Sequence, residues 1–137
     1  MHDDLHVLGR AVKQAQYRQH RAMDSALAAV GTTLAQWDAL RAIDRSPGAS
    51  ARELAAATFQ SEQAFGTLVG RLAAQGLVER RPGHGRRIRH HLTPEGERTL
   101  AAGHGVAGEG PPGCCAPRGP GAGGPLMVVL RRLNAQE

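Results

Sequence analysis

Apolar residues recur at every third or fourth position in several stretches of the chain, and this spacing is the period of an amphipathic helix. The first stretch covers residues 5–30 and is followed by Gly31. The second covers residues 34–43 and begins after Thr33, with Gln36 at the spacing of a capping box. We therefore predict two helices, the second of which buries Trp37 on its inner face.

Two shorter helices are predicted next, separated by a tight turn. Ser50 and Glu53 form a second capping box, which starts a helix over residues 51–57. Ser61 is a good N-cap for a helix that Gly76 ends after Gln75. The apolar residues of this last helix fall on one face, and polar or small residues fall on the other: Phe65, Leu68, Val69 and Leu72 inward, Gln63, Thr67, Gly70 and Arg71 outward.

A basic β-hairpin is predicted directly after this helix pair. Residues 77–81 and 87–93 are typical of strands, and the Gly/Pro-rich sequence RPGHG between them is typical of a loop. In the second strand, Ile88, His90 and Leu92 alternate with Arg89 and His91. Helix, turn, helix and hairpin in this order predict a mainly α winged helix-turn-helix domain.

The C-terminal part of the chain breaks this regular pattern. Thr93, Pro94 and Glu95 signal a further helix start. Residues 103–125 contain nine Gly and five Pro, so we expect an irregular segment there. Residues 126–137 regain helical spacing. We therefore divide the chain into a helix over 1–30, the winged domain over 31–102, the Gly/Pro-rich segment over 103–125 and a last helix over 126–137.

Composition narrows the function. Lys and Arg number 17 against 12 Asp and Glu, a net charge of +5 that favours an anionic partner such as nucleic acid. No apolar run approaches the roughly 20 residues of a membrane span, so we expect a soluble cytoplasmic protein without a membrane partner. The adjacent Cys114 and Cys115 suit neither a disulfide framework nor a zinc site, and the paired histidines lack further ligands. Without a phosphate loop or nucleophile motif, we predict no enzyme, no cofactor and no metal.

The DNA contacts are predicted from side-chain chemistry. A helix can read the major groove where its outer face is narrow and offers donors and acceptors to base edges. We assign this reading role to Gln60, Ser61, Gln63, Ala64, Thr67 and Arg71. The hairpin arginines would hold phosphates, which position the protein without specifying sequence. These residues are Arg80, Arg81, Arg86, Arg87 and Arg89.

From TLAQWDALRAI to LTPEGERTL, and over about residues 5–102, the sequence resembles the MarR (multiple antibiotic resistance) family of transcription regulators. The resemblance implies a homodimer joined through its N- and C-terminal helices, which binds a pseudo-palindromic double-stranded DNA operator and represses. It also implies control by a small phenolic or anionic effector between the dimer helices and the winged domain. That location puts Tyr17, His20, Arg21 and Trp37 in range of the effector, although we expect Trp37 to be an ordinary core residue instead.

Two departures from the family pattern stand out. Arg86, Leu92, Thr93 and Gly96 match the family's wing, but His84 stands where the family has the acid of an ion pair that orients the wing. Residues 103–125 replace what is normally a long helix. Compensating frameshifts in the gene or its reading, or a flexible loop tolerated by the dimer, are alternative explanations. The altered region leaves open a second function, a small-molecule-binding or protein-interaction dimer that has lost operator binding.

Overall fold

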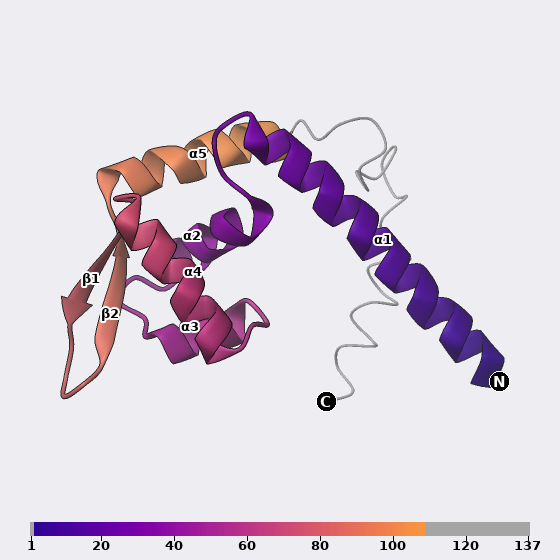
Figure 1. The fold of residues 1–137 in the computed structure, drawn as a ribbon, viewed down its shortest axis with the longest axis horizontal. Coiled ribbons are helices and arrows are strands. Elements are labelled where there is room, and N and C mark those ends of the chain that lie inside the picture. Colours follow the sequence, from indigo (N-terminus) through magenta and orange to yellow (C-terminus); the bar gives the residue numbers. More distant parts are fainter. Residues whose placement is uncertain (1, 109–137) are drawn as a thin grey trace.

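The structure is a computed structural model that describes residues 2–108 (Figure 1). Five helices and one hairpin follow in the order α1 (His2–Ala28), α2 (Leu34–Arg45), α3 (Ala51–Ala57), α4 (Glu62–Ala74), β1 (Val78–Pro82), β2 (Ile88–Leu92) and α5 (Pro94–Gly108). This is the mainly α winged helix-turn-helix architecture that the sequence predicted. The predictions for residues 109–137, including the last helix and both cysteines, lie outside the described residues.

Side-chain hydroxyls start the helices of the winged unit where the sequence placed them. Thr33, Ser50 and Ser61 each accept a hydrogen bond from the backbone N–H three residues further on. Each bond satisfies a donor that the first helical turn leaves without a partner. The predicted starts of α2, α3 and α4 are thereby confirmed.

The core lies where α2, α3 and α4 meet β1 and α5. Its fully buried large side chains include Leu40, Ile43, Leu54, Phe65 and Leu72. Trp37 is 5% exposed, as predicted, and its ring N–H donates to the carbonyl of Leu100 over 3.2 Å. This bond satisfies the one polar group of the indole and ties α2 to α5.

Helix α5 is longer than the sequence predicted. The expected break at Gly103 is wrong for residues 103–108, which continue the helix to Gly108. The reason is a close approach: a Cβ at Gly103 would lie 2.1 Å from Nε1 of Trp37. Glycine lowers helix propensity by about 1 kcal/mol, but here it lets α5 lie against the indole, so packing outweighs propensity.

Helix α1 projects away from the winged unit (Figure 1). Only its C-terminal end joins the core, where Leu27 is fully buried. The Asp24 carboxylate accepts a hydrogen bond of 2.6 Å from the backbone N–H of Leu34, so α1 also holds the first turn of α2. Within residues 2–108, no helix combines the length and the apolar character needed to cross a bilayer.

Candidate nucleic-acid interface

The outward face of α4 carries polar or small side chains. Gln63, Ala64, Thr67 and Arg71 are exposed, as the sequence predicted. The Thr67 hydroxyl donates to the backbone carbonyl of Gln63 over 3.2 Å, which leaves the Gln63 amide as the group able to reach outward. A Cβ added at Gly66 or Gly70 would have no neighbour within 4 Å, so packing within the chain does not require these glycines. Because Gly66 and Gly70 have no side chains, another molecule can approach the backbone of α4 closely on this face.

Two of the predicted reading residues also stabilise the turn before α4. The Ser61 hydroxyl accepts a hydrogen bond of 3.1 Å from the backbone N–H of Ala64 and so caps the helix. The Gln60 amide is half-buried and donates to the Thr58 hydroxyl over 3.3 Å. Contacts of Gln60 and Ser61 with DNA stay predictions.

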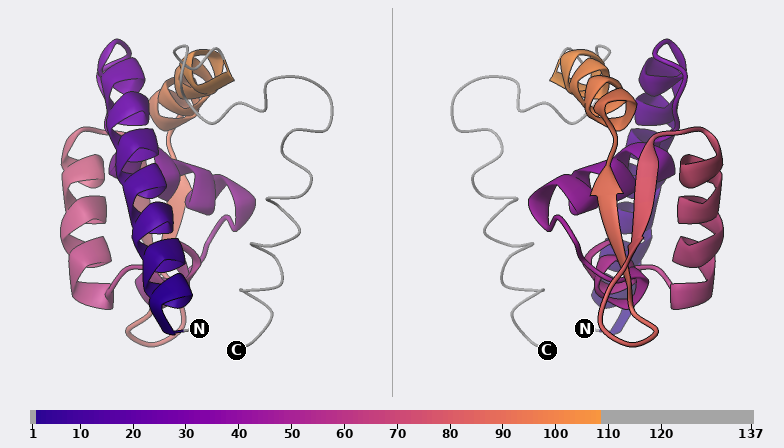
Figure 2. Two further views of the ribbon diagram at one scale, coloured as in Figure 1. Left: turned by 90° about the vertical axis from the view of Figure 1, so that its right-hand side faces the viewer. Right: turned by 90° about the vertical axis from the view of Figure 1, so that its left-hand side faces the viewer.

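Backbone hydrogen bonds join the hairpin to the turn between α2 and α3. Gly48 donates its N–H to the carbonyl of His90 over 2.8 Å, and His90 donates its N–H to Ala49 over 3.1 Å. The His90 ring is 2% exposed, with Nδ1 2.9 Å from the same Ala49 carbonyl. Figures 1 and 2 show the hairpin standing beside α4. Sequence reasoning did not identify His90 as an anchor, although the strand alternation had put it with Ile88 and Leu92.

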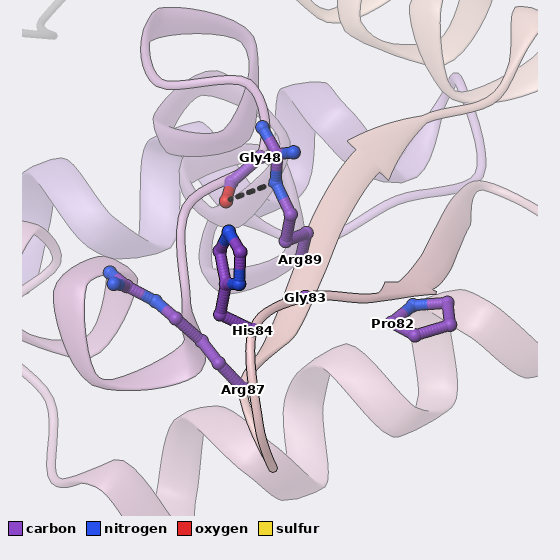
Figure 3. Close-up of a pocket in the computed structure, with 6 residues that line it drawn as sticks. All are labelled: Gly48, Pro82, Gly83, His84, Arg87 and Arg89. Atoms are coloured by element: carbon purple, nitrogen blue, oxygen red, sulfur yellow. Dashed lines mark hydrogen bonds between the residues drawn. The ribbon is translucent and has the colours of Figure 1, made fainter.

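Two wing arginines line a hollow at the loop end of the hairpin, beside the turn between α2 and α3 (Figure 3). The Arg89 Nε group donates to the Gly48 carbonyl over 3.4 Å. The φ of +83° at Gly48 favours glycine in this turn, and a Cβ there would lie 2.5 Å from Nη2 of Arg89, so the arginine would have to shift. Arg87 forms an ion pair with Glu53 of α3. The hollow has a volume of about 500 Å³, and His84 also lines it.

The other predicted wing arginines differ in their partners. Arg81 lies 2.9 Å from Glu79, and this hydrogen-bonded ion pair lowers the pKa of the Glu79 carboxyl and raises the pKa of Arg81. Glu79 therefore stays ionised at neutral pH and offsets the Arg81 charge. Arg80 and Arg86 are exposed, and the described residues include no carboxylate within ion-pair distance of either.

One hollow of about 560 Å³ joins the wing to the helix pair. Glu62 of the first turn of α4 lines it, together with Arg86 and Arg87 of the wing. Residues 50–53 at the start of α3 and Ile88 of β2 complete its wall. The start of α4 and the wing arginines therefore share one continuous surface, which the sequence order could suggest but not measure.

The predicted effector residues fall into two different environments. Tyr17, His20 and Arg21 are exposed on α1, where Arg21 lies 5.8 Å from the centre of the Tyr17 ring. His20 Nε2 lies 3.2 Å from the carboxylate of Asp24. Trp37 instead lies in the core. An effector site formed by these four residues stays a prediction.

Within residues 2–108, His, Cys, Asp and Glu side chains form no group of three or more that could hold a metal ion. The surface formed by α4 and the wing carries the Gln63 amide and exposed arginines, together with the carboxylates of Glu53 and Glu62. Such a surface can hold phosphates through arginine and contact base edges through glutamine.

A family model described as MarR family matches residues 30–88. A mutant MarR from E. coli in complex with operator DNA has a TM-score of 0.84 and 19% identity, covering 97% of each chain. A probable transcriptional regulator from Pseudomonas aeruginosa has a TM-score of 0.81 and 28% identity, covering 91% of this chain and 95% of its own. The transcriptional repressor CouR, bound to a 23-mer DNA duplex, has a TM-score of 0.71 and 26% identity. The match covers 93% of this chain and 84% of the CouR chain. Comparison with curated proteins gives no match.

Proposed function

The chain belongs to the MarR family of winged helix-turn-helix regulators, and we propose that it regulates transcription by binding double-stranded DNA. The observation that carries this proposal is the shared hollow in which the first turn of α4 meets Arg86 and Arg87 of the wing. A helix in the major groove and a wing on the adjacent backbone need such a continuous surface. DNA in the complexes of MarR and CouR gives further support.

We propose that the protein acts as a homodimer. The supporting feature is an apolar stripe on α1 that this chain leaves uncovered: Leu5 is 65% exposed, Leu8 41% and Val12 41%. These residues lie three and four positions apart, so they share one face of the helix. A second copy would cover them. Two-fold symmetry would then place half-sites about 10 base pairs apart on a pseudo-palindromic operator.

The proposed role is that of a repressor without enzymatic activity. A small phenolic or anionic effector would weaken operator binding by changing the separation of the two α4 helices. This part of the proposal rests on the family, with Tyr17, His20 and Arg21 of α1 and Trp37 of α2 as the candidate effector residues.

A fluorescence-anisotropy titration with the DNA upstream of its own gene tests the proposal. We expect saturable binding that is tighter than binding to a scrambled duplex of equal length and that weakens with salt. A dimer that binds neither duplex would contradict operator binding and favour the small-molecule or protein-interaction alternative.

Two substitutions separate the proposed contributions of wing and helix. Arg86→Ala removes a phosphate contact, so it should weaken binding to all duplexes and reduce the slope of log K against log salt by about 0.9 per subunit of the dimer. Arg98→Ala, on α5 and paired with Glu95, is the matched control. Gln63→Ala should instead reduce the preference for the operator over the scrambled duplex, by about 1–3 kcal/mol. A change of sequence preference in Arg86→Ala with an unchanged slope would show that the roles are assigned wrongly.

A further inference from the structure

The N-terminal half of α1 carries positive charge that its surroundings do not balance. Residues 5–23 contain no Asp or Glu, and they include Arg10, Lys13 and Arg18. All three side chains are exposed, and residues 2–108 provide no carboxylate within ion-pair distance of any of them. Arg10 and Lys13 lie three positions apart, a spacing at which like charges repel on a helix surface. An anionic partner would remove this repulsion.

Arg10 and Lys13 line one hollow on this helix. Its volume is about 430 Å³, and Leu5, His6 and Gly9 complete its wall. An added Cβ at Gly9 would have no neighbour within 4 Å, so packing within the chain does not require glycine there. The missing side chain lowers helix propensity but leaves the helix backbone uncovered. A bulky polyanion can therefore approach the helix closely beside Arg10 and Lys13.

These two cations lie on the other side of α1 from the apolar stripe that the proposed dimer covers. At about 100° per residue, Arg10 is turned roughly 140° from Leu5 and roughly 160° from Val12. By the same count, Lys13 is turned roughly 140° from Leu8. A second copy packed on the stripe would therefore leave Arg10 and Lys13 accessible to another partner.

The N-terminal half of α1 also reaches the end of the molecule that carries the proposed DNA surface. Figures 1 and 2 share one vertical axis, and in both the N-terminal end of α1, the hairpin loop and the start of α4 lie toward the lower end. Figure 1 shows that α1 extends sideways beyond the winged unit. A rod-like duplex lying across the hairpin and α4 would therefore continue past this part of α1.

We propose that Arg10 and Lys13 bind phosphates of the duplex outside the stretch that α4 and the wing contact. The inference rests on the proposed DNA binding and extends it to a second, separate surface. None of the residues that line the two wing hollows lines this one. Guanidinium and ammonium groups hold phosphates without reading sequence. DNA is favoured over an acidic protein as the partner, because a duplex held by the winged unit passes this helix.

The test is a fluorescence-anisotropy titration of the full chain with a long scrambled duplex at a series of salt concentrations. Arg10→Gln combined with Lys13→Gln should reduce the slope of log K against log salt by about 1.8 per subunit, at about 0.9 for each phosphate contact. The matched control is Arg18→Gln combined with Arg98→Gln, which removes the same net charge from α1 and α5 outside the hollow. Its slope should equal that of wild type. Glutamine has nearly the helix propensity of Arg and Lys, so both variants should fold.

The length of the duplex distinguishes a contact at α1 from a general effect of charge. A duplex trimmed to the roughly 10 base pairs of one half-site ends before it reaches α1. On this trimmed duplex, wild type and the variant of Arg10 and Lys13 should have the same salt slope. The difference between them should return only on the long duplex.

The inference is wrong if the variant of Arg10 and Lys13 keeps the wild-type slope on the long duplex, a result that would favour an acidic protein as the partner. It is also wrong if the control loses as much slope, if the loss persists on the trimmed duplex, or if wild type binds no duplex. Preference for the operator over the scrambled duplex tests the proposed function separately. Equal binding of both duplexes by wild type would contradict operator recognition only, whereas an unchanged slope with an intact operator preference would contradict this inference only.

Discussion

Gly103→Ala tests whether α5 is held to the domain by its contact with Trp37. In an isolated helix this change would stabilise by about 1 kcal/mol. Here the new Cβ would lie 2.1 Å from Nε1 and 2.4 Å from Cδ1 of Trp37, so the indole must move. Movement costs about 1–3 kcal/mol for overpacking, and loss of the buried bond to Leu100 costs about 1–3 kcal/mol more. We expect a net destabilisation of about 1–5 kcal/mol.

The assay is urea unfolding followed by far-UV circular dichroism at one fixed protein concentration, because association of subunits would shift the apparent stability. Gly105→Ala is the matched control: it lies in the same helix, and its added Cβ would have no neighbour within 4 Å. The control should be more stable than wild type by up to about 1 kcal/mol. If Gly103→Ala were as stable as Gly105→Ala, the contact with Trp37 would not be what holds α5 in place.

Two further substitutions test the wing charge and a second close approach. Glu79→Gln frees Arg81, so the salt slope of DNA binding should steepen by up to about 0.9 per subunit; an unchanged slope would mean that Arg81 faces no phosphate. Because Arg81 lowers the pKa of Glu79, the pair persists at neutral pH and is lost only as pH falls through that lowered value. Gly96→Ala puts a Cβ 2.0 Å from the Leu77 carbonyl. It should destabilise by about 1–3 kcal/mol in the same urea assay, whereas Gly9→Ala, without a neighbour within 4 Å, should not.

Local signals made most of the fold predictable from sequence. Ser61 and the apolar spacing of Phe65, Val69 and Leu72 fixed both the start of α4 and the face that it buries. Helix caps and helical periodicity depend on neighbours within a few positions, which a single sequence displays directly. The outward face of α4 followed from the same pattern.

The features that the sequence did not reveal depend on partners far along the chain. The bond from Arg89 to Gly48 and the contact of the His90 ring with Ala49 each join residues 41 positions apart. The continuation of α5 past Gly103 depends on Trp37, which belongs to a helix near the other end of the domain. Propensity predicts a break at such a glycine, and only the packed structure shows the space that the glycine leaves.

Contacts that only the structure shows also change how many wing arginines should be counted toward the salt dependence of DNA binding. The sequence offers five arginines, and at about 0.9 per phosphate they would contribute roughly 4.5 to the salt slope of each subunit. The structure pairs Arg81 with Glu79 and Arg87 with Glu53. Arg89 bonds to a neutral carbonyl, so it keeps its full charge, as do Arg80 and Arg86, which have no carboxylate within ion-pair distance among residues 2–108. Three free charges reduce the expected contribution to roughly 2.7 per subunit, because a guanidinium that already faces a carboxylate releases fewer counterions when it meets a phosphate.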